Sequence, residues 1–103
     1  MAEWEKVAQV GDIAPGEMKL VKTGEEPIVL TNVDGNYFAF SDICTHEMGS
    51  LSEGFLEGQI VTCPMHGSEF NVRTGEPVGP PADEPIATYQ VRIEGQDIFI
   101  ALP

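Results

Sequence analysis

Two short stretches of the chain hold every cysteine and histidine that it has. CTHEMG contributes Cys44 and His46, and CPMHGSEF, after sixteen intervening residues, contributes Cys63 and His66. A cysteine standing alone is most often a small buried hydrophobe, and a histidine standing alone is most often a satisfied polar group. Four such side chains in two matched loops, with none elsewhere, instead indicate a metal site.

Three kinds of site could use two thiols and two imidazoles. Tetrahedral zinc accepts this set, but structural zinc sites commonly take like ligands from close pairs in the sequence. Here each loop supplies one thiol and one imidazole, which suits a 2Fe-2S cluster whose one iron takes both cysteines and whose other iron takes both histidines. A disulfide between Cys44 and Cys63 is the remaining alternative, and it would leave the two histidines unexplained.

The segments around these loops alternate with the period of β-strands. In IATYQVRI, the side chains of Ala87, Tyr89, Val91 and Ile93 fall on one face, which predicts a half-buried strand. DIFIAL at 97–102 is then expected to be the returning arm of a hairpin.

A second hairpin is predicted around Asp34 and Gly35, a pair suited to the positive φ angles of a tight turn. Shorter strands are expected at Glu5–Val7, Met18–Lys22, Gln59–Thr62 and Glu69–Val72. No segment keeps a helical period over about ten residues, so the expected fold is all-β, a small antiparallel sandwich or barrel. A chain of 103 residues is expected to form a single domain, 1–103.

The charge balance is strongly acidic. Lys and Arg total 5, Asp and Glu total 17, and the formal net charge is -12, so we expect no nucleic-acid partner, because such binding relies on cationic side chains. Between Asp42 and Glu84, eight acids accompany a single base, Arg73. No apolar run reaches the roughly 18 residues of a membrane helix, and the N-terminus lacks the pattern of a secretory signal. We therefore expect no membrane association and a cytoplasmic location.

CTH and CPMHGSEFN resemble the Rieske 2Fe-2S motif. The whole chain is similar to the small Rieske ferredoxins of bacterial ring-hydroxylating dioxygenase systems, such as those for biphenyl and carbazole. SLSEG at 50–54, TGEP at 74–77 and GPP at 79–81 fall where such ferredoxins carry similar segments. The resemblance implies a Rieske fold whose cluster-binding part, built by the two Cys/His loops, spans about 42–82.

The resemblance also implies the ligands and the function. Cys44 and Cys63 would hold the inner iron of one 2Fe-2S cluster, and His46 and His66 would hold the outer iron near the surface. The chain would be a monomeric one-electron carrier rather than an enzyme, taking electrons from an NAD(P)H-dependent flavoprotein reductase and passing them to a terminal oxygenase. The small Rieske subunit of an assimilatory nitrite reductase and a zinc-stabilised binding module are the alternatives.

Several loop residues are expected to tune the reduction potential. Gly49 and Gly67 lack a Cβ, so backbone N–H groups can approach the sulfides. Rieske proteins of the respiratory type carry a disulfide between the loops and a tyrosine that donates to a ligand sulfur, and the matching positions here are Gly49, Met65 and Phe70. Only Ser68 remains as a side-chain donor. Fewer donors in an acidic surround predict a potential toward the low end of the Rieske range, about -150 mV.

The remaining apolar residues of the loops are expected to form a docking patch. Met48, Met65, Phe70 and Pro81 would frame the histidine ligands inside an acidic rim. Pro80 and Pro81 would belong to a third loop that covers the cluster. Contacts of this kind are small, and the complexes that they form are short-lived.

Overall fold

The structure is a computed structural model that describes residues 3–23, 26–44, 49–64, 67–79 and 84–102. The described chain is built almost wholly from β-strands, with a single turn of 3-10 helix, η1, at Leu51–Glu53. The strands are β1 (Glu3–Gln9), β2 (Met18–Thr23), β3 (Glu26–Val33), β4 (Asn36–Ser41), β5 (Phe55–Glu57), β6 (Ile60–Thr62), β7 (Glu69–Asn71), β8 (Pro77–Gly79), β9 (Thr88–Tyr89), β10 (Val91–Glu94) and β11 (Asp97–Leu102).

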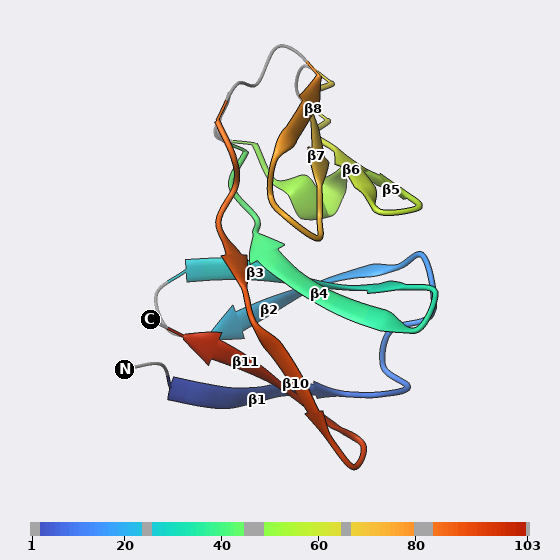
Figure 1. The fold of residues 1–103 in the computed structure, drawn as a ribbon, viewed down its shortest axis with the longest axis vertical. Coiled ribbons are helices and arrows are strands. Elements are labelled where there is room, and N and C mark those ends of the chain that lie inside the picture. The colour runs from blue at the N-terminus through green and yellow to red at the C-terminus, as the bar shows by residue number, and fades with distance from the viewer. Residues whose placement is uncertain (1–2, 24–25, 45–48, 65–66, 80–83, 103) are drawn as a thin grey trace.

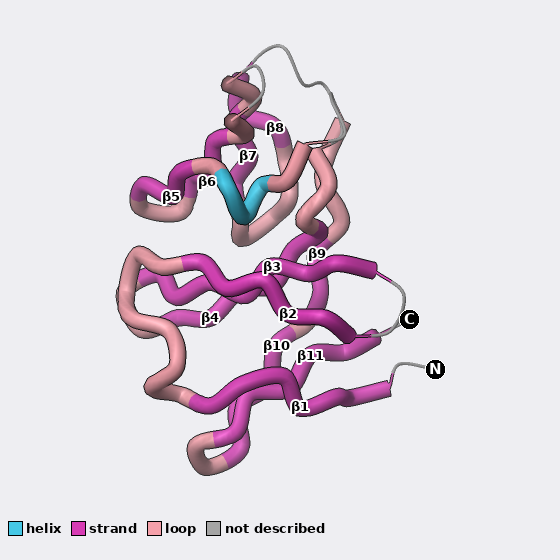
Figure 2. The backbone as a smooth tube through the Cα atoms, turned by 180° about the vertical axis from the view of Figure 1, so that it is seen from behind, coloured by secondary structure: helices cyan, strands magenta, loops and turns pink. Residues whose placement is uncertain are grey.

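These strands form three antiparallel sheets stacked along the longest axis of the molecule (Figure 1). We call them the lower sheet (β1-β11-β10), the middle sheet (β2-β3-β4-β9) and the upper sheet (β5-β6-β7-β8). The upper sheet is inserted in the sequence between β4 and β9 of the middle sheet. Figure 2 shows the same three layers from behind, with η1 between the middle and the upper sheet. The all-β antiparallel fold class predicted from the sequence is confirmed.

Strand β3 of the middle sheet is buried on both faces. Ile28 and Leu30 pack with Ile98 and Ile100 of the lower sheet in one core cluster. Val29, which points the other way from β3, belongs to a second cluster that reaches into the upper sheet. Side chains 28 to 31 of β3 are consequently all 0% exposed. This strand reads as a continuous apolar run rather than an alternation because both of its faces are covered.

The hairpin predicted at Asp34 and Gly35 is confirmed. Val33 pairs with Asn36, and the two turn residues have φ angles of 52° and 90°, as a tight hairpin turn requires. The predicted returning arm at 97–102 is β11, which pairs with β10. The four shorter predicted strands are also present, as β1, β2, β6 and β7, whereas β5 and β8 were not predicted.

The prediction of a single half-buried strand over IATYQVRI, 86–93, is wrong. The chain breaks at Gln90, so that β9 pairs with β4 in the middle sheet and β10 pairs with β11 in the lower sheet. Ala87 is exposed and Ile93 is 45% exposed, while Tyr89 and Val91 are half-buried. The alternation in the sequence is real, but the segment moves from one sheet to the next, so that only Ile86 at its start is fully buried.

Candidate metal centre

The two cysteine loops start at the ends of strands that bound the upper core cluster. Cys44 follows β4 of the middle sheet, and Cys63 follows β6 of the upper sheet. The start of the first loop is fixed to the middle sheet, because the Asp42 N–H donates to the Pro27 carbonyl at 3.0 Å. The Leu51 N–H in turn donates to the Asp42 carbonyl at 2.8 Å, which brings the chain back beside its starting point.

The two loops close in the same way. The Cys44 N–H donates to the Gly49 carbonyl at 3.0 Å, and the Cys63 N–H donates to the Ser68 carbonyl at 2.7 Å, so each cysteine bonds to the residue five positions further on. The second loop has an additional bond, from the Gly67 N–H to the Cys63 carbonyl at 3.1 Å. Gly67 has a φ of 76°, a conformation that favours glycine. Each cysteine therefore lies at the hydrogen-bonded base of its loop.

Both cysteines are buried in the core. Cys44 is 2% exposed and Cys63 is 1% exposed, and the two side chains belong to the same core cluster. They form no disulfide, so the disulfide alternative is wrong. Two buried cysteines in one apolar cluster, each at the base of an equivalent loop, are suited to share a metal centre, since the thiolate is the form that binds metal.

Six of the residues predicted for the site lie outside the described residues. Within the described part of the chain, no group of three or more Cys, His, Asp or Glu side chains gathers around a common point. The structure thus places the two cysteines, and the assignment of all four side chains as ligands stays a prediction. The residues outside the described part are His46, Met48, Met65, His66, Pro80 and Pro81.

Ser68 provides an independent test of whether the loops suit a cluster. Its side chain is 0% exposed, and its Oγ has no hydrogen-bond partner among the described residues. A buried hydroxyl without a partner is costly, and few occur in native proteins. Ser68 closes the loop that begins with the buried thiol of Cys63, so a sulfur-rich acceptor at this place would satisfy it. The residues present fit a Rieske cluster.

Phe70 does not lie on the surface, contrary to the docking role expected for it. It is 0% exposed and packs in the same core cluster as Cys44 and Cys63. The reason is the alternation of β7, in which Glu69 is exposed and Phe70 points inward across from Val61 of β6. Phe70 therefore keeps the surroundings of the thiols apolar and is not part of a docking patch.

Asp42 belongs to the acid-rich stretch 42–84 of the sequence, but it is only 5% exposed. Its Oδ1 accepts a hydrogen bond from the Ser52 N–H at 2.7 Å, and this bond ties the first loop to η1. The only signal in the sequence was its position two residues before Cys44. Burial could not be read from that position.

Gly54, like Asp42, helps to position the ligand loops and was not predicted from the sequence to do so. A Cβ placed on it would lie 1.9 Å from the Thr62 carbonyl oxygen and 3.1 Å from Pro64 Cδ. Only glycine fits at such a distance, so Gly54 lets the chain leaving η1 pass directly against the second loop.

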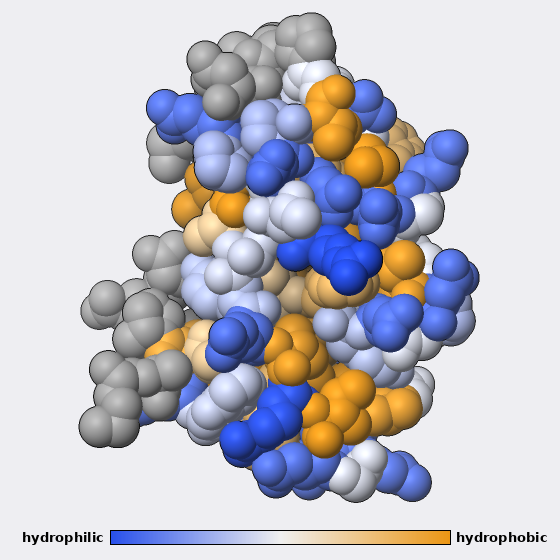
Figure 3. Space-filling view, viewed as in Figure 1, coloured by the Kyte–Doolittle hydropathy of each residue, from blue (hydrophilic) through white to orange (hydrophobic). Residues whose placement is uncertain are grey.

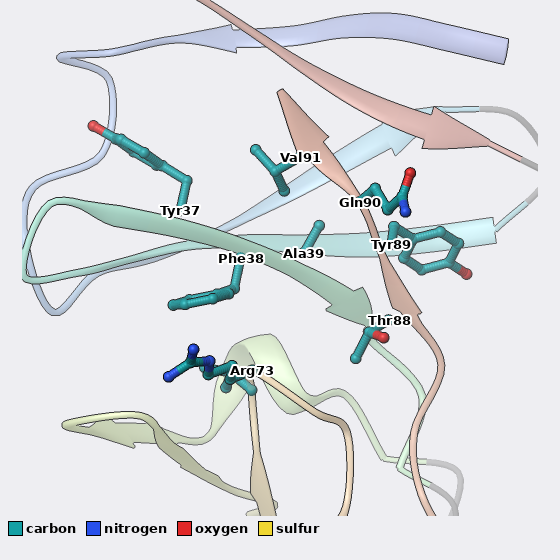
Figure 4. Close-up of a pocket in the computed structure, with 9 residues that line it drawn as sticks. Tyr37, Phe38, Ala39, Arg73, Thr88, Tyr89, Gln90 and Val91 are labelled. Atoms are coloured by element: carbon teal, nitrogen blue, oxygen red, sulfur yellow. The ribbon is translucent and has the colours of Figure 1, made fainter. Parts of the chain in front are cut away.

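A groove of about 340 Å³ opens between the middle sheet and the turn after β7 (Figure 4). Phe38 and Arg73 lie close together on one side of it, and Tyr37 and Tyr89 point away from each other toward its two ends. Neither cysteine is among the residues that line it. The groove is therefore separate from the metal centre.

The chain matches the family model of the Rieske [2Fe-2S] domain over residues 3–90. It belongs to this family, whose cofactor is one 2Fe-2S cluster. The zinc alternative is accordingly set aside, and the predicted cofactor is confirmed.

The relatives of this chain include named ferredoxins. The ferredoxin component of biphenyl 2,3-dioxygenase from Rhodococcus jostii (strain RHA1) is 44% identical over 97 residues, which covers 94% of this chain and 91% of the relative. The ferredoxin subunit of 3-phenylpropionate/cinnamic acid dioxygenase from Escherichia coli (strain K12) is 43% identical over 95 residues, 91% and 89% of the two chains.

Solved structures agree with these sequence relatives. The Sphingomonas yanoikuyae B1 ferredoxin superposes with a TM-score of 0.92 at 33% identity, covering 98% of this chain and 100% of that one. A chain from the complex of reduced oxygenase and oxidised ferredoxin in carbazole 1,9a-dioxygenase superposes with a TM-score of 0.91 at 36% identity, covering 95% and 92%. The predicted Rieske fold is confirmed.

Proposed function

We propose that this protein is the ferredoxin component of a ring-hydroxylating dioxygenase system, carrying single electrons to a terminal oxygenase. The observation that carries the proposal is the pair of buried cysteines at the bases of two equivalently closed loops, in a chain of the Rieske family. The named relatives support it, because they are ferredoxin components of such systems. None of these named relatives is a nitrite reductase subunit, and the ferredoxin role is preferred for that reason.

We assign the ligands within this proposal as follows. Cys44 and Cys63 would hold one iron, and His46 and His66 would hold the other. When bound, the cluster supplies a centre that accepts and releases one electron. The chain's own residues shield the thiolate side from water, since both cysteines and Phe70 are at most 2% exposed. The cluster-binding part is proposed to span about 42–82.

The partners follow from the same role. The carbazole 1,9a-dioxygenase ferredoxin was solved in complex with its reduced oxygenase, which supports an oxygenase as the electron acceptor of the present chain. An NAD(P)H-dependent flavoprotein reductase is proposed as the electron donor.

No helix in the described part of the chain could span a membrane. A cytoplasmic monomer is the simplest form for a carrier that visits two enzymes in turn.

An EPR-monitored redox titration of the cluster-loaded protein tests the assignment. We expect a rhombic Rieske signal that appears on reduction, with a midpoint toward the low end of the range, about -150 mV. Absence of the signal would refute the ligand assignment. A midpoint several hundred millivolts higher would instead indicate a quinol-linked chain and would contradict the dioxygenase role.

A reconstitution then tests the partners. The protein is combined with an NAD(P)H-dependent flavoprotein reductase and the oxygenase component of biphenyl 2,3-dioxygenase, and NAD(P)H-dependent oxidation of biphenyl is followed. We expect turnover that requires this protein, with a variant carrying Cys63→Ser as the inactive control. Tight co-purification with a large haem enzyme would favour the nitrite reductase alternative.

A further inference from the structure

Phe55, the first residue of β5, is 71% exposed, the largest exposed fraction among the large hydrophobic residues that the structure describes. Apolar side chains are scattered among hydrophilic ones across the face shown in Figure 3, and a partly exposed apolar residue is ordinary on a protein surface. A phenylalanine that is 71% exposed is unusual, and its position decides whether it has a role.

The strand pairing places Phe55 on the outer side of the upper sheet. Leu56 packs against the core cluster, so Phe55 and Glu57 point away from it. Phe55 pairs with Thr62, and Thr62 pairs with Glu69 on the next strand. A Cβ placed on Gly79 of β8 would lie 3.7 Å from Glu69 Oε1, which puts that carboxylate over the last strand of the sheet. We use the name outer face for this row of residues together with Glu57; the row consists of Phe55, Thr62, Glu69 and Gly79.

The outer face adjoins the second ligand loop. Thr62, the partner of Phe55, is the residue directly before Cys63. Gly54, directly before Phe55, is held against the Thr62 carbonyl and close to Pro64 of that loop. The most exposed aromatic side chain is therefore one strand away from the buried thiol of Cys63, on the side of the sheet that faces solvent.

The charged side chains of η1 and of the upper sheet are all acidic. Glu53, Glu57 and Glu69 are all exposed, and the only base between Asp42 and Glu84 is Arg73, which lines the separate groove. A surface of this kind fits a partner that offers an apolar socket ringed by lysine or arginine side chains, because opposite charges steer the encounter while the buried aromatic slows dissociation.

We propose that the outer face is a docking surface for the apolar, cation-ringed electron-transfer site of a redox partner, with Phe55 as its anchor. The inference rests on the proposed role as an electron carrier and extends it, because it adds a side face of the upper sheet to the contact made by the ligand loops. It also assigns a role to β5, whose outer edge is unpaired within the described sheet.

The test uses mitochondrial cytochrome c as a probe, because its exposed haem edge is ringed by lysines. One electron passes from the reduced protein to the ferric haem, and the second-order rate constant is measured by stopped flow for wild type, Phe55→Ser, Phe55→Leu and Ile93→Ser. Ile93 is the matched control, since it is 45% exposed on β10 of the lower sheet. The reduction potential of each variant is measured, and rates are compared at equal driving force.

We expect Phe55→Ser to lower the rate constant about fivefold, Phe55→Leu to stay within about twofold of wild type, and Ile93→Ser to be unchanged. Equal rates for Phe55→Ser and wild type would overturn the proposal, as would an equal loss in Ile93→Ser or a Phe55→Leu variant as slow as Phe55→Ser. Because cytochrome c is not a dioxygenase component, a failure at Phe55 is distinct from a failure to support biphenyl oxidation.

Discussion

Ser68 is the residue whose surroundings depend most on the cofactor. Its hydroxyl is fully buried and has no partner among the described residues, although it lies in the loop that starts at Cys63. A hydroxyl that donates to the cluster should stabilise the reduced form, because that form carries the additional negative charge. If the difference is about 1 kcal/mol, the one-electron potential changes by about 40 mV.

We therefore predict that Ser68→Ala lowers the reduction potential by about 40 mV. The measurement is a redox titration followed by EPR. Ser52→Ala is the control, because Ser52 lies in the same part of the molecule and contributes its backbone N–H, not its hydroxyl, to the bond with Asp42. An unchanged potential in Ser68→Ala would show that the hydroxyl does not reach the cluster.

For Phe70 we predict a change in the reduction potential that is opposite in sign to the change for Ser68. It packs with both cysteines and donates no hydrogen bond, whereas respiratory Rieske proteins carry a donating tyrosine at the matching position. We predict that Phe70→Tyr raises the potential by about 40 mV, by the same conversion. The titration is repeated on this variant, and an unchanged or lower value would contradict the hydrogen-bond explanation of the low potential.

For single residues, the sequence predicted which side chains are candidate ligands better than it predicted which side chains are buried. Cys44 and Cys63 could be chosen because cysteine is rare and the loops match. Asp42 and Phe70 could not be placed, because whether a side chain points into the core depends on strands that pair far along the chain. Asp42 is buried by contacts with Pro27 and Ser52, and both lie at least ten residues away.

Among the elements, η1 and the second ligand loop are held together at Gly54. A Cβ at this position would lie 1.9 Å from a backbone oxygen of Thr62, and backbone cannot move aside as a flexible side chain can. The β5–β6 hairpin and the base of the Cys63 loop both depend on this contact.

We predict that Gly54→Ala destabilises the protein by about 3 kcal/mol and lowers Tm by roughly 15 °C. Thermal unfolding followed by circular dichroism measures the change, and the iron content of the purified variant should fall with it. Gly11→Ala is the control, since a Cβ on Gly11 would meet nothing within 4 Å, and its Tm should be unchanged. A stable Gly54→Ala variant with full iron content would contradict this account.

The elements themselves were predictable where the pattern was local. The turn at Asp34 and Gly35 depends on φ angles that its own residues favour, and it was found. The break at Gln90 depends on two sheets competing for one segment, and periodicity alone cannot reveal it. The strands β5 and β8 have three residues each, too few for an alternation to be visible.

For the whole molecule, the stacking of the sheets separates the ligand loops from the lower sheet along an axis 39 Å long. The Debye length at 0.1 M salt is about 10 Å. Acids of the upper sheet can therefore influence an encounter at the ligand loops, while acids of the lower sheet are screened from it. The formal net charge of -12 favours solubility of the chain as a whole, but the charges near the ligand loops decide how a partner approaches them.

We predict that electron transfer to cytochrome c slows as ionic strength rises, and that the effect originates from the acids of η1 and the upper sheet. Two double variants are compared: the first combines Glu53→Gln with Glu57→Gln, and the second combines Glu3→Gln with Glu5→Gln. Each double variant changes the net charge from -12 to -10, and all four side chains are exposed. At 0.1 M ionic strength the first pair should lower the rate constant roughly threefold, and the second pair should leave it within about 1.5-fold of wild type. Equal losses in the two double variants would show that total charge, and not its placement, controls the encounter.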